Sequence, residues 1–411
     1  MKTFRPDHRL NVPIKLFAGY RFLVFALCAL CFLCGELTAQ EYKTLKDGIE
    51  YAEVTKEISG KSVNINLLRL DLRKVRLDVV HAMDAAIGTE KTSSIATRHG
   101  AFAAINAGFF RLDKSVWAGE AAGILKINGS LLSESEKNRS AIFISNTKLR
   151  TNVSFERITI VSSLKIGEKE TPISGINRER KLNDSILYTP EFGRTTLTAL
   201  DGMEVVVKKG VVQAFKNNAG NSTIPRNGYV VSVSGIARDI LIQQRIKVGQ
   251  KLKIVKRVTS VGEIVGDKER QWVARTAEAY EQSEDITNGV PQLIKNGRVD
   301  ITWEQEKTTK AFVETRHPRT AVARLKDGKF LMITVDGRTE SSGGIGLQDL
   351  AEYLLSLGAV DAMNLDGGGS TTMFVDGKVV NHPSDKEGER KVSDAILVTP
   401  RKPAENGRKK N

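Results

Sequence analysis

The residues best suited to chemistry lie in one short stretch, Asn364-Leu365-Asp366-Gly367-Gly368-Gly369-Ser370-Thr371-Thr372. Three consecutive glycines add no side chain to a core, and each costs roughly 0.5–1 kcal/mol relative to alanine in a regular element. Their backbone can adopt positive φ angles, approach a ligand closely and present amide groups to an anion. We therefore expect this stretch to form a binding site. Its predicted members are Asp366, Gly367, Gly368, Gly369, Ser370 and Thr371.

Three arginines occupy polar loops in the same region. Arg319 precedes an apolar segment, Arg338 follows the next one together with Asp336, and Arg390 lies near the last one. Guanidinium groups bind phosphate and carboxylate groups through paired hydrogen bonds. If the strands between these loops are neighbours in one sheet, the arginines surround Asp366. An anionic group is then the expected ligand.

These features also have structural interpretations. An isolated Asp-Gly pair usually marks a turn. His317 and His382 stand beside prolines, where packing of a loop is a more common role than catalysis. Arg390 can pair with a neighbouring carboxylate, Asp385 or Glu389. The triple glycine favours a functional site, because a turn needs only one or two glycines.

Two upstream segments carry polar groups typical of sugar sites. Asn106 interrupts the apolar run from Ala104 to Phe110, where it either caps a turn or positions a substrate hydroxyl. Trp117 and Glu120 could supply an aromatic platform and a carboxylate. Glu120 is equally consistent with an exposed surface acid.

The composition argues against several kinds of site. The chain has 411 residues, a formal net charge of +14 and 5 scattered histidines, and no His/Cys cluster has the spacing of a transition-metal site. No Walker-type phosphate loop is present, and we expect no metal and no cofactor. The basic charge is typical of a solvated surface or of attraction to phosphorylated or anionic carbohydrate. Nucleic acid is not an expected partner, because no nucleic-acid-binding motif is present.

The elements that must position these residues are mostly strands. Segments 320–325 and 330–335 flank an Asp-Gly turn and predict a hairpin. Residues 347–357 place leucines on one helical face and end at Gly358, which predicts a helix with a glycine stop. A short helix is expected near 91–99, and strands on both sides of the glycines. The predicted fold class is α+β, with strand-rich mixed sheets and a few helices.

The N-terminal segment is typical of an export signal. Basic residues precede an apolar run of about 13 residues, Phe22–Cys34, which is shorter than the roughly 20 residues that span a bilayer. We expect cleavage after Ala39, no permanent membrane span afterwards, and a periplasmic, cell-surface or secreted protein. All 3 cysteines lie in this segment, so no disulfide is expected. A lipoprotein anchored through Cys34 is the less favoured alternative.

The rest of the chain divides into three predicted regions. Residues 40–94 alternate apolar and polar positions as half-buried strands do. Residues 95–400 form the main domain, with a lobe boundary expected near 261–315, where the sequence becomes polar. Residues 401–411 are predicted to be a basic, disordered tail.

Taken together, these motifs resemble the phosphodiester glycosidase family over roughly residues 95–400. The match rests on the segments 106–110, 317–320, 335–338, 364–371 and 388–393. The chain departs from the family pattern at Ala107, where a glycine is usual, and at 287–290, which is less glycine-rich. The resemblance implies a phosphodiester glycosidase-like domain, and the chain looks like a bacterial member.

The resemblance implies cleavage of a sugar-1-phosphodiester at the anomeric carbon, which releases a free sugar and a phosphomonoester. On this hypothesis Arg319, Arg338 and the glycine amides hold the phosphate, and Asp366 orients or deprotonates water or binds sugar hydroxyls. Glu120 is the reserve candidate for that role. Ser370, Thr371 and Arg390 complete the polar surroundings of the substrate. Two alternatives remain: a glycosidase or lyase acting on another anionic envelope or dietary polysaccharide, and a non-catalytic glycan-binding protein.

Overall fold

The structure is a computed structural model that describes residues 40–135, 138–259 and 266–402. The described residues from Lys43 onward form one compact unit. The predicted signal segment, its cysteines and residues 403–411 of the predicted tail lie outside the described residues. Arg401, placed in that tail by the sequence, is instead anchored, because its guanidinium donates to the carbonyl oxygens of Val75 and Thr147.

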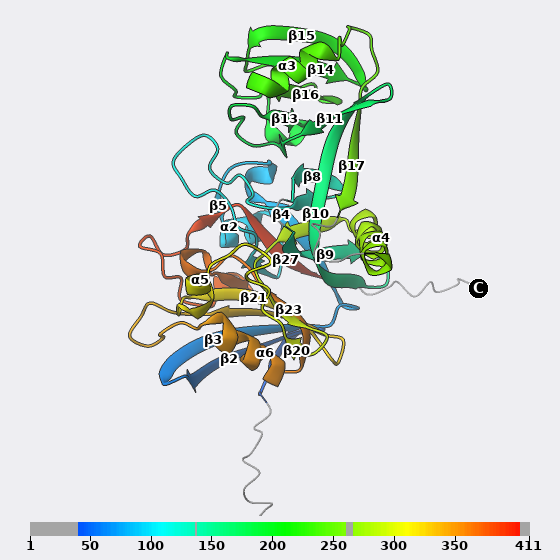
Figure 1. Cartoon of the computed structure of the whole chain (residues 1–411). Helices are drawn as coiled ribbons and strands as arrows, with labels where there is room; N and C mark the ends of the chain where they lie inside the picture. Colours follow the sequence, from blue (N-terminus) through cyan, green and yellow to red (C-terminus); the bar gives the residue numbers. More distant parts are fainter. Residues whose placement is uncertain (1–39, 136–137, 260–265, 403–411) are drawn as a thin grey trace, which may run out of the picture. The chain divides into compact units, whose positions relative to one another are not determined.

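The largest sheet has eight strands and contains the predicted hairpin (Figure 1). Its order is β1 (Lys43–Lys46), β2 (Ile49–Ile58), β3 (Lys61–Leu70), β22 (Phe330–Val335), β21 (Arg319–Leu325), β23 (Ala359–Asn364), β19 (Gln292–Lys295) and β20 (Arg298–Val299). Arg319 pairs with Val335 across the hairpin, so the loops before β21 and after β22 begin side by side.

A five-stranded sheet supplies the other strands next to the glycine-rich stretch. Its order is β25 (Lys378–Val379), β24 (Met373–Val375), β6 (Ala103–Asn106), β27 (Asp394–Pro400) and β4 (Val75–His81). A small ladder joins β5 (Glu90–Lys91) to β26 (Lys391–Val392). The stretch 365–372 therefore connects β23 of one sheet to β24 of another.

Two further sheets form the middle of the chain. One has the order β11 (Lys169–Ile173), β10 (Thr151–Ile166), β9 (Arg139–Asn146), β18 (Asp285–Asn288), β7 (Leu125–Ile127) and β8 (Ser130–Ser133), with β17 (Lys253–Thr259) also paired to β10. The other has the order β12 (Gly175–Ile176), β13 (Ser185–Tyr188), β16 (Gly228–Val233), β14 (Gly202–Lys208) and β15 (Val211–Ala219). The long strands β10 and β17 run between them (Figure 1).

Five α-helices and three short 3₁₀ turns accompany these sheets in the described residues. They are η1 (Ala82–Asp84), α2 (Thr92–Arg98), η2 (Pro190–Phe192), α3 (Gly235–Gln243), α4 (Asp267–Gln282), α5 (Lys310–Glu314), α6 (Leu347–Ser356) and η3 (Gly368–Ser370). The α+β prediction is confirmed, as are the hairpin, the helix near 91–99 and the helix ending before Gly358, whose φ is 88°.

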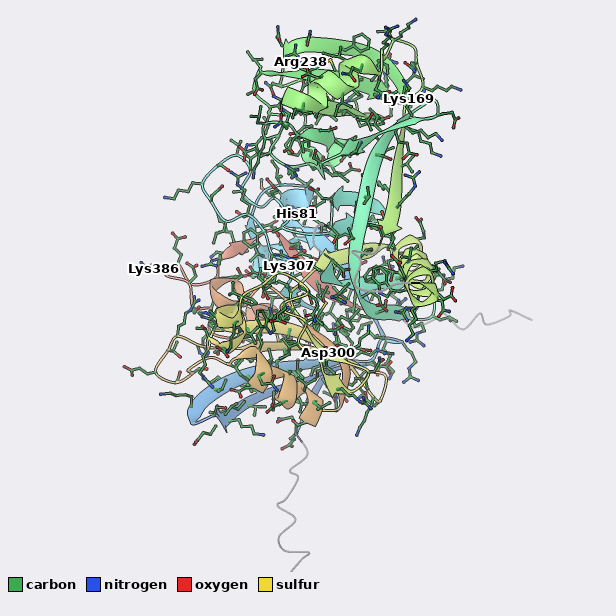
Figure 2. The ribbon with its side chains drawn as sticks, viewed as in Figure 1. His81, Lys169, Arg238, Asp300, Lys307 and Lys386 are labelled. Atoms are coloured by element: carbon green, nitrogen blue, oxygen red, sulfur yellow. The ribbon has the colours of Figure 1, made fainter. Side chains whose placement is uncertain are left out.

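Hydrophobic side chains fill the space between the sheets. One core joins the eight-stranded sheet to the five-stranded sheet of β6 and β27, with Val322, Met363, Ile105 and Ile396 fully buried. A second core packs beneath β14 and β16. Charged side chains such as Lys169 and Lys386 point outward (Figure 2). The site loops thus rest on a rigid, close-packed support.

The regional divisions expected from composition differ from the strand pairing. Strand β3 pairs with β22 and β4 pairs with β27, so residues 40–94 are built into the main sheets. Strands β18 and β19, from the segment expected to be a lobe boundary, are interior strands of two sheets. Composition misses this because strand pairing depends on contacts between distant parts of the chain.

Candidate functional site

The glycine-rich loop is fixed at its entrance by strand β6. The backbone N–H of Asp366 donates to the carbonyl of Ala107 at 2.9 Å, and the Asn106 side chain donates to the carbonyl of Asp366 at 2.7 Å. The Asn106 oxygen accepts from the Thr320 hydroxyl and the Thr372 amide. Asn106 is fully buried, so it holds Asp366 in place and does not point into open space. This geometry favours the structural interpretation of Asn106.

Asp366 has the properties of a group that exchanges protons near neutral pH. Burial raises the pKa of its carboxyl group to about 7, although the Ser370 hydroxyl, the Arg390 guanidinium and the Gly367 amide act in the opposite direction. The charge of Asp394 raises the same pKa by a smaller amount. A carboxyl group balanced in this way can act as a general base or acid at physiological pH.

The amides of Gly367 and Gly368 do not form the anion-binding backbone that the sequence predicts. The Gly368 amide donates to the carbonyl of Pro318 at 2.8 Å, and the Gly367 amide faces the Asp366 carboxyl group. Gly368 has a φ of 60°, which an L side chain rarely adopts. The glycines therefore let the loop lie against Pro318, and the amides of Gly367 and Gly368 are not directed toward a ligand.

Arg338 and His317 lie over the same loop. A Cβ atom on Gly368 would be 3.2 Å from Nη2 of Arg338, so the guanidinium lies directly against the glycine backbone. The same Nη2 donates to Nδ1 of His317 at 3.3 Å. Burial and the nearby Arg319 and Arg338 charges lower the pKa of His317. Arg338 is exposed and forms no ion pair with any described residue, so its charge is available to an anion.

Arg319 differs from the expected phosphate ligand. Its guanidinium is buried and donates to the backbone carbonyls of Phe312, Thr315 and Ile345. Burial and the neighbouring Arg338 charge lower its pKa to about 10. With these donors already used, Arg319 joins α5 and the segment before β21 to the loop before α6, and it does not present a pair of free donors to the site.

Arg390 covers the third glycine as one half of an ion pair. It binds Asp385 at 2.6 Å, which was the structural alternative weighed from the sequence. A Cβ atom on Gly369 would lie 2.4 Å from Nη2 of Arg390 and 2.8 Å from Oδ2 of Asp385. The absent side chain at Gly369 is therefore what allows this pair to close over the loop.

Asp336 is buried and holds His382, which the sequence interpretation had set aside. One Asp336 oxygen accepts from the His382 amide at 3.0 Å, and the other lies 3.1 Å from Nδ1 of its ring. The His382 side chain is 74% exposed, so its Nε2 faces solvent. An acid that orients an exposed imidazole is a common arrangement in catalytic sites. The sequence does show an acid and a histidine at two strand ends. It gives no local signal that their side chains are in contact.

Ser370 and Thr371 lie beneath the surface of the loop. Both are fully buried. The Thr371 hydroxyl has no hydrogen-bond partner among the described residues, and its carbonyl accepts from Asn381. Asp394, missed from the sequence, accepts from the Gly108 amide and the Thr287 hydroxyl. These groups support the loop from below.

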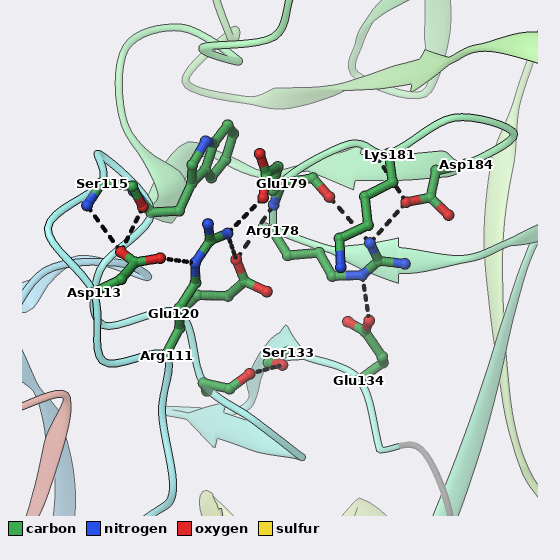
Figure 3. Close-up of polar contacts among 12 residues, drawn as sticks. Arg111, Asp113, Ser115, Glu120, Ser133, Glu134, Arg178, Glu179, Lys181 and Asp184 are labelled. Atoms are coloured by element: carbon green, nitrogen blue, oxygen red, sulfur yellow. Dashed lines mark hydrogen bonds and ion pairs between the residues drawn. The ribbon is translucent and has the colours of Figure 1, made fainter.

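Glu120 lies in a separate pocket (Figure 3). Among the described residues, none of the glycine-rich loop lines that pocket, whose lining is Glu120, Ala121, Ala122, Gly123, Ser133, Glu134, Arg139, Arg178, Lys181 and Asp184. Burial raises the pKa of Glu120. Trp117 is only 7% exposed and packs against Phe192, so it offers no aromatic platform. The structure therefore separates Glu120 from Asp366.

Within residues 40–402, apart from the short gaps, no three His, Cys, Asp or Glu side chains are grouped to hold a metal ion. In the same part of the chain, no helix combines the length and the apolar character needed to cross a membrane.

The fold and site define an α+β protein in which a glycine-rich loop carries a carboxyl group of raised pKa and lies, at Gly368, against an exposed arginine from a neighbouring loop. Residues 201–399 match the sequence model of a family described as phosphodiester glycosidase. This range contains Arg319, Arg338, Asp366 and Arg390. The family resemblance drawn from the motifs is thereby confirmed for this part of the chain.

Individual relatives match shorter stretches. The N-acetylglucosamine-1-phosphodiester alpha-N-acetylglucosaminidase of Bos taurus is 39% identical over 109 residues, which cover 24% of this chain and 20% of that protein. The SPbeta prophage-derived uncharacterized protein YomE of Bacillus subtilis (strain 168) is 42% identical over 94 residues, 23% of this chain and 14% of that protein. The matches thus span a fifth or less of these relatives.

Among solved structures, a hypothetical protein from Synechocystis has a similar fold. It superposes with a TM-score of 0.71 at 24% sequence identity, covering 89% of this chain and 64% of the other. At this identity the likeness concerns the fold alone.

Proposed function

We propose that this chain is an exported hydrolase that cleaves a sugar-1-phosphodiester at the anomeric carbon and releases a free sugar and a phosphomonoester. The observation that carries the proposal is one glycine-rich loop that holds Asp366, whose pKa is about 7, and that lies at Gly368, two residues further on, against the exposed Arg338. The bovine relative is named for a sugar-1-phosphodiester substrate, which supports this bond type. The signal-like residues 1–39 support export.

In the proposed reaction, water attacks the anomeric carbon while the bond from that carbon to the phosphate oxygen breaks. Asp366 accepts a proton from the water, and the bonding electron pair stays on the departing phosphate. Because a phosphomonoester is already a stable anion, strong acid assistance is less important than in ordinary glycoside hydrolysis. Arg338 stabilises the charge that develops on the leaving group.

The other predicted residues take supporting roles in this proposal. Asn106 and Arg319 position the loops, as their buried hydrogen bonds indicate. Asp336 orients His382, which with His317 can donate or accept hydrogen bonds to the substrate. Arg390, paired with Asp385, lies over Gly369 at the edge of the glycine-rich loop.

The position of bond cleavage tests the proposal directly. Hydrolysis of an N-acetylglucosamine-1-phosphodiester in oxygen-18 water should place the label in the released sugar, measured by mass spectrometry. Label in the phosphomonoester would show cleavage at phosphorus and refute the glycosidase assignment. A panel of other sugar-1-phosphodiesters extends the test if this sugar is not accepted.

The role of Arg338 is tested with a matched arginine on the same hairpin. Arg338→Ala should lower kcat/KM for a phosphodiester about 100-fold or more, in the range seen when one preorganised charge-stabilising donor is lost. Arg324→Ala is the control, because Arg324 pairs with Asp361 at the other end of β21. Equal losses for the two variants, or equal losses on uncharged glycosides, would contradict the phosphate-binding role.

A further inference from the structure

The pocket that contains Glu120 is a built site that the proposed chemistry does not use. Its volume is about 330 Å³, at the lower end of the roughly 300–1,000 Å³ typical of small-molecule sites. Figure 3 shows the Glu120 carboxyl group on one side, and the Lys181 and Arg178 side chains on the other. A pocket of this size can hold one small polar group, such as a sugar ring.

One wall of the pocket is rigid. Arg178 donates to Glu134 at 2.9 Å and to Asp184 at 2.8 Å, and further to the carbonyls of Ser174 and Glu179. Glu134 also accepts from the Ile176 amide. Because these groups satisfy one another, the wall is held in place without a ligand.

The facing groups keep hydrogen-bonding capacity for a ligand. Glu120 makes only long contacts, 3.6 Å to Arg111 and 3.4 Å to the Glu179 amide, both through Oε2. Its Oε1 has no hydrogen-bond donor among the described residues, and Lys181 makes no ion pair within the same set. A carboxylate acceptor and an ammonium donor therefore face the same space.

The charge of the lining favours an uncharged ligand. Three cationic side chains, Arg139, Arg178 and Lys181, are balanced by three acids, Glu120, Glu134 and Asp184. A balanced lining gives no net attraction to an anion or a cation. It does offer donors and acceptors together, which is what the hydroxyl groups of a neutral sugar need.

The pocket is connected to Asp366 through a short piece of backbone. The carbonyl of Ala107 accepts from the Asp366 amide, and the carbonyl of Phe109 accepts from the amide of Ala122, which lines the pocket. Three residues of chain span at most roughly 10 Å. A glycan of a few sugar units can therefore reach from the reacting bond into the pocket.

We propose that this pocket is a subsite for an uncharged sugar unit, in which Glu120 and Lys181 bind hydroxyl groups of a glycan whose phosphodiester lies at Asp366. The substrate class is thus an oligosaccharide or polysaccharide, beyond a single sugar. The inference rests on the proposed function only for the identity of the reacting bond. Sugar binding in the pocket can be measured without turnover.

The test is direct binding of a panel of uncharged oligosaccharides of glucose, mannose, galactose and N-acetylglucosamine, with uronate oligosaccharides of equal length as the charged arm. Binding is measured by calorimetry on an Asp366→Asn background, so a failure of the hydrolase proposal leaves the readout intact. We expect an uncharged glycan to bind, and Glu120→Gln and Lys181→Ala each to weaken it about tenfold, the loss of one good hydrogen bond.

Glu168→Gln is the matched control, because that side chain is 99% exposed and is not part of the pocket lining. Equal urea midpoints for all variants would show that the folds are comparable. The proposal is overturned if no uncharged glycan binds, if uronates bind and uncharged glycans do not, or if the pocket variants bind as the control does.

Discussion

At the scale of single residues, the site depends on the difference between two kinds of charged side chain that look alike in the sequence. Arg319 and Arg338 both stand at strand ends in polar loops. Arg319 donates hydrogen bonds to backbone carbonyls, whereas Arg338 is exposed and lies over Gly368. Direction, and not residue type, decides which arginine can meet a ligand.

Asp366 gives the sharpest prediction at this scale. Its pKa of about 7 lies well above the usual value near 4 for an aspartate, so the carboxylate forms only as pH rises through 7. If Asp366 is the base, kcat should rise about tenfold per pH unit below pH 7 and level off above it. Asp366→Asn should lower kcat roughly 10²–10⁴-fold and abolish this inflection, measured in initial-rate pH profiles.

The matched control is Asp376→Asn. Asp376 is exposed in the turn after β24 and has a φ of 47°, a conformation that asparagine also tolerates. Full activity in Asp366→Asn, or a pH profile unchanged by it, would remove Asp366 from proton transfer.

At the scale of elements, the site is assembled by ties between loops that belong to different strands. Arg319 at the start of β21 donates to Phe312 in α5 and to Ile345 in the loop before α6. Its guanidinium also lies 4.9 Å from the ring of Phe312. One buried side chain thereby fixes three segments around the glycine-rich loop.

Arg319→Met should therefore act through stability and loop position. Methionine keeps much of the length but removes the donor to the carbonyls of Phe312 and Thr315, while the Ile345 carbonyl keeps the His317 amide. The cost is roughly 1–3 kcal/mol for each buried group that water cannot reach. We expect the free energy of unfolding in urea to fall by about 2–4 kcal/mol. Arg270→Met, in α4, should cost less than about 1 kcal/mol, because Arg270 and its partner Asp267 are both exposed. Similar losses of unfolding free energy for both variants would contradict this structural role of Arg319.

Local patterns predicted the elements, and pairing over long distances set their arrangement. The hairpin of β21 and β22 and the helix α6 follow from alternation, an Asp-Gly turn and a glycine stop within a few residues. The pairing of β3 with β22, about 260 residues apart in the chain, has no local signal. The Asp336–His382 contact escaped prediction for the same reason, since it joins loops 46 residues apart.

At the scale of the whole molecule, the positive net charge, which is +14 for the full sequence with the predicted export signal included, acts on any anionic substrate before it reaches the loop. Part of this charge lies far from Asp366. Arg150 and Lys326 are exposed beside one another at the far end of β21, whose seven residues separate them from Arg319 by roughly 20 Å. The screening length of salt is about 30 Å at 0.01 M and about 8 Å at 0.15 M. Their field therefore reaches the site only at low salt.

This difference in range gives a prediction about association with substrate. The double reversal Arg150→Glu/Lys326→Glu lowers the net charge by four without touching the loop. We expect kcat/KM for a phosphodiester to fall about two- to fivefold at about 0.01 M salt and to match the unaltered protein at about 0.15 M, because only the long-range field changes. The kcat value should stay constant at both salt concentrations, since the reacting groups are intact. A loss that persists at 0.15 M salt, or that appears equally with an uncharged glycoside, would mean that these residues act by local contact or through the fold and not by steering.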